Sequence, residues 1–325
     1  MTHAVRTRSR PRLLLTATLS VLAVLLAGCG GSPGPDTGNS PVSIGTLPFA
    51  GVAGWQVASD EGYFAEAGIE VEYVELRTPA DVVPNLLNGT VNLGALNIGN
   101  LSQALAQGLD LSIIGVTYYA DNDMSILTMK GSGISAPADL EGRTVGLFQL
   151  ENANHAALLE TLEGQGVDTA AIEFVLIPAT EMPAALRSGQ VDAGHVLYPL
   201  ATTMADETDI VIENMMEPYG EQPVQAYNIV NTAWAEQNPD VVAGLQQALA
   251  RGNERAGTDQ DALIAAVAEL TGAPTELLAA SKLPAFGSDL KLDSSRRQLE
   301  IMTKYGFLDA PVDLAAHVYR NQETG

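Results

Sequence analysis

The sequence contains a single cysteine, Cys29, among 325 residues. One cysteine excludes an intramolecular disulfide, and it argues against a metal site built from thiolates. Histidine is also scarce, with four residues, and neither a Ser–His–Asp spacing nor a phosphate-binding loop stands out. Because so little acid–base chemistry is available, we expect no catalytic activity, no cofactor and no bound metal.

Positive charge is in short supply as well. Sixteen lysines and arginines stand against 39 acidic residues, which gives a formal net charge of −23. A surface of this sign repels phosphate backbones, so we expect no nucleic-acid partner. The acidity favours solubility and by itself says nothing about a ligand.

Long apolar runs are confined to the start of the chain. Four arginines precede an apolar run at 13–27, which closes with Leu26-Ala-Gly-Cys29. A basic segment, a short apolar run and small residues at its end are typical of a secretory signal peptide, here residues 1–28, although an uncleaved anchor begins in the same way. The Leu-Ala-Gly-Cys sequence resembles a bacterial lipobox, which implies cleavage before Cys29 and attachment of lipid to its thiol.

Removal of residues 1–28 takes away four arginines and lowers the formal charge by four, from −23 to −27. Residues 29–41 are rich in Gly, Ser and Pro and have no apolar periodicity, so they are expected to form a flexible tether. No second apolar run of membrane-spanning length follows. We therefore expect a folded body held by lipid at the outer face of the cytoplasmic membrane.

An internal repeat organises the folded body. The stretch Leu86-Leu-Asn-Gly-Thr-Val-Asn-Leu-Gly94 recurs, 100 positions later and without a gap, as Leu186-Arg-Ser-Gly-Gln-Val-Asp-Ala-Gly194. In each copy an apolar helical run stops at a glycine, which adopts the positive φ of a helix C-cap, and a short strand follows. Chance similarity among abundant residues is the alternative, but the order of helix, glycine and strand before each copy also repeats. Open α/β sheets bind ligands at the carboxyl ends of their strands, so two such units predict two lobes that face one cleft.

A family resemblance agrees with this repeat. Ile134-Ser-Ala-Pro-Ala-Asp-Leu-Glu-Gly142, with the strand expected at 144–148, resembles the opening of the second lobe in type II periplasmic binding proteins of ABC importers. Together with Glu61-Gly-Tyr-Phe-Ala-Glu-Ala-Gly-Ile69, the repeat and the lipobox, it makes residues 42–230 resemble the nitrate/sulfonate/taurine and thiamine-pyrimidine branch of that family.

The resemblance implies an α/β fold of two lobes with a ligand cleft between them, joined by two crossover strands. We expect lobe 1 to comprise 42–128 and 228–325, and lobe 2 to comprise 129–227. The C-terminal part matches the family only in its helical character.

Loops at the carboxyl ends of the predicted strands supply the candidate ligand contacts. Their side chains offer aromatic faces, amide donors and acceptors, a carboxylate and imidazoles, and glycine leaves backbone N–H groups accessible. The candidates are Phe49, Gly51, Trp55, Asn97, Tyr118, Gln149, Glu151, Asn152, Asn154, His155, His195, Tyr198 and Tyr227. For some of them a structural role is the alternative: Phe49, Trp55 and His195 as packed residues, and Asn152 or Asn154 as an N-cap.

The predicted cleft loops contain no lysine or arginine. Sites for anions commonly use an arginine fork or a lysine, although backbone N–H groups at helix termini also bind anions. Aromatic faces, amides and the acceptors Glu151, Asp121 and Asp123 suit a neutral or weakly basic nitrogenous aromatic such as a pyrimidine. A sulfonate, taurine or nitrate is the alternative within the same family.

The function expected from these observations is capture of a small molecule by lobe closure, with a monomer delivering its ligand to an ABC permease in the membrane. The same resemblance reaches a fungal pyrimidine synthase, but that activity is associated with a cysteine-rich motif and a reactive histidine. The mature chain has no cysteine beyond the anchor. A lipoprotein that senses a ligand and signals to a membrane partner also agrees with the sequence.

Overall fold

The structure, a computed structural model, describes residues 41–121 and 123–320. The predicted signal peptide at 1–28, the predicted lipidation residue Cys29 and all but the last residue of the tether at 29–41 lie outside the described residues. Within the described ranges, no helix is both long enough and apolar enough to cross a membrane.

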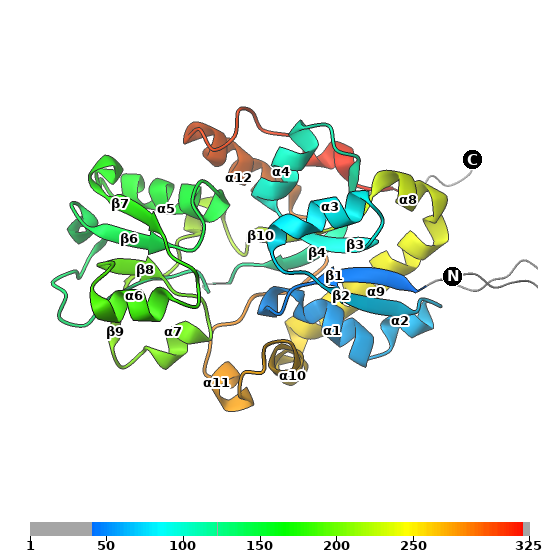
Figure 1. The fold of residues 1–325 in the computed structure, drawn as a ribbon, viewed down its shortest axis with the longest axis horizontal. Helices are drawn as coiled ribbons and strands as arrows, with labels where there is room; N and C mark the ends of the chain where they lie inside the picture. Colours follow the sequence, from blue (N-terminus) through cyan, green and yellow to red (C-terminus); the bar gives the residue numbers. More distant parts are fainter. Residues whose placement is uncertain (1–40, 122, 321–325) are drawn as a thin grey trace, which may run out of the picture. The chain divides into compact units, whose positions relative to one another are not determined.

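The first sheet has five strands in the order β2–β1–β3–β10–β4 (Figure 1). The strands β1, β2 and β3 are parallel, and β10 runs antiparallel between β3 and β4. The bounds are Val42–Thr46 (β1), Val71–Glu75 (β2), Leu93–Asn97 (β3), Leu111–Tyr119 (β4) and Val224–Asn231 (β10). This sheet and the helices packed on it form the first lobe.

The second sheet repeats this plan in the order β7–β6–β8–β5–β9. The strands β6, β7 and β8 are parallel, and β5 runs antiparallel between β8 and β9. The bounds are Ile126–Met129 (β5), Thr144–Leu147 (β6), Glu173–Leu176 (β7), Ala193–His195 (β8) and Thr208–Ile212 (β9). This sheet and its helices form the second lobe.

The chain passes between the sheets twice, at 120–125 and at 213–223. The lobe boundaries expected at 128/129 and 227/228 therefore fall inside β5 and β10, each of which belongs to one sheet only. The glycine-rich turn at 131–133 follows β5, but β5 pairs in the second sheet and not in the first. The crossovers thus lie a few residues earlier than the sequence suggested.

Twelve α-helices are present in the described residues, and Gly62, at φ 73°, separates α1 from α2. Their bounds are Ala53–Asp60 (α1), Tyr63–Glu66 (α2), Val82–Leu87 (α3), Ile98–Ala106 (α4), Ala153–Gly164 (α5), Met182–Ser188 (α6), Leu200–Thr203 (α7), Thr232–Gln237 (α8), Pro239–Thr258 (α9), Gln260–Thr271 (α10), Thr275–Ala279 (α11) and Leu292–Lys304 (α12). Short 3-10 helices lie at Ala50–Val52, Pro79–Asp81, Pro137–Leu140, Thr169–Ala171, Glu217–Tyr219 and Leu314–His317.

The sequence repeat corresponds to two equivalent structural units, α3–β3 and α6–β8. After each helix a glycine adopts a positive φ, 77° at Gly89 and 72° at Gly189. The following valine then donates its backbone N–H back to the helix, Val91 to the carbonyl of Asn85 and Val191 to that of Ala185. A left-handed glycine therefore turns the chain into the strand in the same way in both lobes.

The polar residue of the repeat, Asn92 or Asp192, hydrogen-bonds each unit to the neighbouring strand. Asn92 Oδ1 accepts the backbone N–H of Ser43 at 2.9 Å, and Asp192 Oδ2 accepts that of Thr144 at 2.9 Å. Both acceptors satisfy a backbone donor at the beginning of a central parallel strand, β1 or β6. The difference between Asn and Asp in the repeat thus leaves this contact unchanged.

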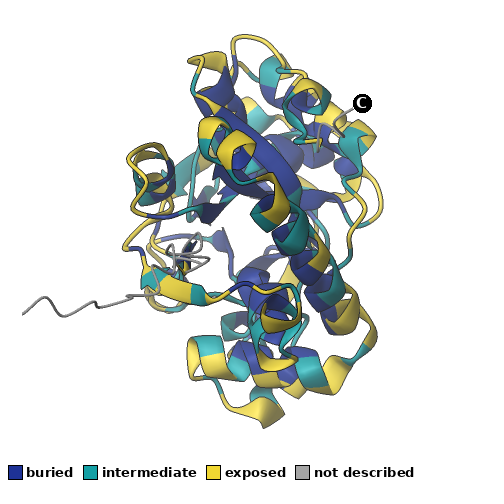
Figure 2. Ribbon diagram, turned by 90° about the vertical axis from the view of Figure 1, so that its right-hand side faces the viewer, coloured by how far each residue is buried: buried dark blue, intermediate teal, exposed yellow. Residues whose placement is uncertain are grey.

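One apolar core extends through both lobes. Buried residues are concentrated on the strands, and exposed residues lie on the outward helix faces and in loops (Figure 2). One apolar cluster includes Leu96 of β3, Val145 of β6 and Leu299 of α12. Helix α12 packs against both α4 of the first lobe and α5 of the second, so the C-terminal helix contributes to both lobes.

A glycine substitution tests the repeated turn. We expect Gly189→Ala to lower the free energy of unfolding by about 1–2 kcal/mol, because a side chain at φ 72° is held in the left-handed region. Gly164→Ala is the matched control, since its added Cβ meets no atom within 4 Å and its φ is not positive. Urea unfolding of both variants measures the difference, and equal stability of the two variants would contradict the proposed role of the turn.

Candidate functional site

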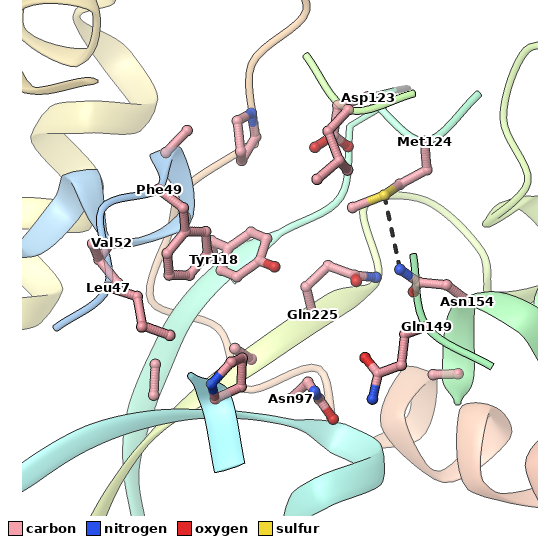
Figure 3. Close-up of a pocket in the computed structure, with 18 of the residues that line it drawn as sticks. Leu47, Phe49, Val52, Asn97, Tyr118, Asp123, Met124, Gln149, Asn154 and Gln225 are labelled. Carbon is pink, nitrogen blue, oxygen red and sulfur yellow. Dashed lines mark hydrogen bonds between the residues drawn. The ribbon is translucent and has the colours of Figure 1, made fainter. Parts of the chain in front are cut away.

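A cavity of about 360 Å³ lies where the loops that follow the strands of both sheets meet (Figure 3). The first lobe contributes residues after β1, β3 and β4, and the second lobe contributes residues after β6 and β8. Its volume is at the small end of the range for sites that bind small molecules. Of the thirteen candidates, eight line it: Phe49, Gly51, Asn97, Tyr118, Gln149, Asn152, Asn154 and Tyr198.

Aromatic side chains form one wall of the cavity. The rings of Phe49 and Tyr118 meet edge to face, with centroids 5.8 Å apart and an interplanar angle of 74°. Gly51 permits this approach, because a Cβ there would contact Phe49 Cε2 and would lie 2.7 Å from Tyr118 Cε1. An aromatic wall of this kind offers an apolar face to a flat ligand.

Amide side chains at helix N-termini face the cavity from both lobes. Asn97 Oδ1 caps α4 by accepting the N–H of Asn100 at 2.8 Å, and Asn152 Oδ1 caps α5 by accepting that of His155 at 2.9 Å. Asn152 Nδ2 also donates to Gln149 Oε1 at 3.1 Å. These bonds leave Asn97 Nδ2 and Gln149 Nε2 without an acceptor in the described part of the chain, so both are available as donors.

Asp123, in the first crossover, lines the same cavity and is only 6% exposed. Its Oδ1 accepts the backbone N–H of Asp121 at 2.9 Å. Burial raises the pKa of the Asp123 carboxyl to about 6, although hydrogen bonds from backbone N–H groups and the charge of Lys282 lower it. The sequence identified Asp123 as an acceptor in a cleft loop, but not that its carboxylate is buried.

Gln225 reaches the cavity from the start of β10, where the pairing with β4 is irregular. Val224 is opposite Tyr119 and Ala226 is opposite Tyr118, which leaves Gln225 as an extra residue in a β-bulge. A bulge redirects a side chain relative to the regular strand. Nothing in the local sequence pattern around Gln225 predicts a bulge.

A basic residue, Lys282, also lines the cavity, whereas the cleft loops expected from the sequence contained none. Its Nζ lies 3.4 Å from Glu213 Oε1 and 6.0 Å from the centroid of the Tyr198 ring. Lys282 belongs to the segment after α11, where the sequence showed only helical periodicity. The positive charge is therefore present at the cavity but is paired with an acidic residue of the second crossover.

Two aromatic candidates lie in the core of the first lobe instead of on the cavity. Trp55 is 1% exposed, and its Nε1 donates to Asn228 Oδ1 at 2.9 Å. Tyr227 is fully buried, and its hydroxyl donates to the carbonyl of Leu290 at 2.7 Å. Their polar atoms are satisfied by the protein, so neither is free to contact a ligand.

The remaining three candidates lie behind the cavity or outside it. His195 is 1% exposed and packs against Phe148, which lines the cavity, with ring centroids 4.9 Å apart. His155 lies between the rings of Phe174 and Phe307, and its Nδ1 accepts the backbone N–H of Glu151. Glu151 is exposed. Burial lowers the pKa of both imidazoles to about 4, so both histidines are neutral near pH 7.

The glycine under the aromatic wall gives a test of the cavity. We expect Gly51→Ala to displace the rings of Phe49 and Tyr118 and to weaken ligand binding about tenfold, which the ligand-induced rise in the thermal midpoint measures. Gly115→Ala on β4 is the control, since its Cβ would make an ordinary contact at 3.4 Å with Asn228 Nδ2. Unchanged binding by the Gly51 variant would show that these rings do not contact the ligand.

Buried His195 gives a pH prediction. The pKa of His195 is lowered from 6.5 to about 4 in the folded protein, so the unfolded chain binds the proton first. The stability that neutral His195 contributes is fully present above pH 6.5 and is lost as the pH falls toward 4, by about 2 kcal/mol between pH 7 and pH 5. We expect His195→Gln to flatten the pH dependence of the unfolding free energy in this window. The quantity to compare is the slope of the unfolding free energy against pH, because packing lost in the variant lowers stability equally at every pH. An unchanged slope would contradict the lowered pKa of His195.

Comparison with solved structures identifies the fold. The crystal structure of the periplasmic aliphatic sulphonate binding protein SsuA from Escherichia coli superposes with a TM-score of 0.70, covers 87% of this chain and 98% of that chain, and is 19% identical in sequence. Identity this low establishes the fold alone. It confirms the expected α/β fold of two lobes found in periplasmic binding proteins.

Sequence relatives confirm the resemblance to the branch named above. The taurine-binding periplasmic protein of Escherichia coli (strain K12) is 24% identical over 188 residues, which are 58% of this chain and 58% of the relative. The formylaminopyrimidine-binding protein of Halalkalibacterium halodurans is 26% identical over 206 residues, which are 61% of this chain and 60% of the relative. The chain thus matches less than two thirds of the length of either protein.

A family comparison covers a longer continuous part of the chain. Residues 50–262 match the family described as NMT1/THI5 like. The matched region includes both crossovers and both copies of the repeat, and it spans more than half of the sequence. The chain belongs to the NMT1/THI5-like family.

Proposed function

We propose that this protein is a monomeric, extracytoplasmic solute-binding protein of an ABC importer, anchored by lipid at Cys29, and that its ligand is a small nitrogenous aromatic such as a pyrimidine. The observation that carries the proposal is the cavity to which both lobes contribute aromatic and polar side chains. A ligand that contacts both lobes stabilises their closed arrangement. The relatives named as taurine- and formylaminopyrimidine-binding proteins support this class of function.

The chemistry of the cavity favours a nitrogenous aromatic over an anion. Phe49 and Tyr118 provide aromatic surface, and Asn97 and Gln149 provide amide donors. No arginine lines the cavity within the described residues, and the one lysine pairs with Glu213. A buried anion needs a nearby cation or several donors to offset its desolvation. The inventory fits a flat, uncharged or weakly basic ligand better.

Contacts between the lobes beside the cavity support closure as the mechanism. The hydroxyl oxygens of Thr202 in α7 and Ser281 lie 2.7 Å apart, and Lys282 pairs with Glu213 in the same region. The segment that contains Ser281 and Lys282 joins the first lobe at Ala285, which exchanges backbone hydrogen bonds with Tyr119 of β4. A membrane permease that recognises this closed arrangement would distinguish the loaded protein from the empty one.

A sulfonate, taurine or nitrate is the second candidate ligand. Lys282 lines the cavity, and the N-termini of α4 and α5 face it with Asn97 and Asn152. Backbone N–H groups at helix N-termini attract anions. We regard this ligand class as second because the carboxylate of Asp123 lies in the same cavity.

Other classes of function have less support from the site. Catalysis of the synthase type uses a reactive histidine, whereas His155 and His195 are buried away from the cavity. A sensor lipoprotein would use the same cavity and the same closure. The sensor differs from an importer subunit only in its membrane partner. Co-purification with a permease would identify an importer subunit.

Thermal unfolding against a ligand panel tests the proposal. We expect pyrimidines or other heteroaromatics to raise the midpoint by several degrees at about 100 times the dissociation constant, since that concentration stabilises the folded state by about 2.7 kcal/mol. Flavins, taurine, alkanesulfonates and nitrate complete the panel.

Matched variants connect any shift to the cavity. Phe49→Leu should reduce the shift, whereas Tyr73→Leu, at a side chain on β2 outside the cavity, should leave it intact. A shift with sulfonate or nitrate alone would overturn the proposed ligand class but keep the binding function.

A further inference from the structure

We infer that Asp123 selects the charge of the ligand, pairing with a protonated or N–H-bearing nitrogen, while the side-chain amide of Gln225 donates to an acceptor atom of the same molecule. The inference rests on the proposed function and deepens it, because it names the polar groups that the ligand must carry. Both side chains line the cavity, and Figure 3 shows them together with Tyr118 of the aromatic wall.

Among the described residues, Asp123 has no side chain that donates a hydrogen bond to it. Its side chain is 6% exposed, and its hydrogen bonds come from backbone N–H groups, with the donor of Asp121 at 2.9 Å. A buried carboxylate is costly unless donors or a cation compensate its charge.

The charged groups around Asp123 do not supply that compensation. Asp121, on the same crossover, adds a like charge, and Lys282 adds an opposite one. Lys282 is itself paired with Glu213 at 3.4 Å. Burial, followed by the negative charge of Asp123, raises the pKa of the Tyr118 hydroxyl. With burial as the largest effect, the pKa of Asp123 is raised to about 6. The carboxylate is therefore ionised near neutral pH with part of its charge unpaired.

Gln225 provides a buried hydrogen-bond donor that has no acceptor among the described residues. The residue is 7% exposed, and its Nε2 is buried without an acceptor among the described residues. The β-bulge sets its side chain apart from the regular pairing of β10 with β4. A buried amide donor without an acceptor is unfavourable, so a ligand atom with a lone pair would satisfy it.

These two requirements define a ligand class. The ligand presents an N–H donor or a cationic nitrogen to Asp123 and a lone pair to Gln225, as an amino-substituted nitrogen heterocycle does. Sulfonate and nitrate groups carry acceptors only and would place negative charge against the carboxylate. For a heterocycle that remains uncharged, affinity should rise with pH through about 6 as Asp123 ionises and then level off.

Calorimetric titration of the full-length protein in detergent at pH 7.5 tests the inference with three probes: 4-amino-2-methylpyrimidine, 2-methylpyrimidine and ethanesulfonate. We expect the wild type to prefer the aminopyrimidine, and Asp123→Asn to weaken its binding at least tenfold while ethanesulfonate binding improves. Asp121→Asn, on the same crossover but not on the cavity, is the matched control and should change binding less than twofold. Equal affinity of the Asp123 variant and the wild type for the aminopyrimidine would overturn the inference and leave the proposed function standing.

A second readout needs no ligand. Because the protein compensates the buried Asp123 carboxylate only in part, Asp123→Asn should raise the thermal midpoint, with a difference that grows between about pH 4 and about pH 6 and then levels off. If the wild type binds none of the probes but the two midpoints differ in this way, the proposed ligand class is wrong. The result would still support a partly unpaired Asp123 carboxylate. A lower midpoint for the variant at pH 8 would show that the protein already satisfies the carboxylate, and this result would overturn the inference.

Discussion

The pairing of β10 between β3 and β4 is the constraint on which the rest of the structure depends. It returns the chain to the first sheet after the second lobe is complete, and so it fixes where both crossovers run. Its buried Asn228 accepts hydrogen bonds from Trp55 and Thr117 and donates to the carbonyl of Val116, which joins α1, β4 and β10. Long-range pairing of this kind requires a large loop closure before its contacts form, and both lobes are held by the result.

The same strand also holds the C-terminal segment in place. The hydroxyl of Tyr227 bonds to Leu290 and Ser295, and Gln298 of α12 donates to the carbonyl of Val224 at the bulge. These contacts bring residues of the last third of the chain to a cavity that otherwise consists of strand-end loops. Helix α12 continues from there to α5, so the C-terminal segment connects the two lobes in addition to the crossovers.

The cavity combines aromatic and amide groups with charged groups, and these come from different parts of the fold. The loops after β1, β3 and β6 provide aromatic and amide groups whose positions follow from strand ends and helix caps. The first crossover, the start of β10 and the segment after α11 lie outside the repeat, and they provide Asp123, Gln225 and Lys282. Among the described residues that line the cavity, the charged side chains therefore come only from the first crossover and the segment after α11.

The sequence by itself determined the two helix–strand units, the positive φ at Gly89 and Gly189, and the N-cap at Asn152, because each of these depends on neighbouring residues. It also placed eight of the thirteen candidates on the cavity, since strand ends in parallel sheets meet at one edge.

Only the tertiary structure decided that Trp55 and His195 are buried away from the cavity, that a bulge redirects Gln225, and that Lys282 arrives from the segment after α11. Burial, register and the approach of distant segments are set by contacts between residues far apart in the chain, and no local pattern records them.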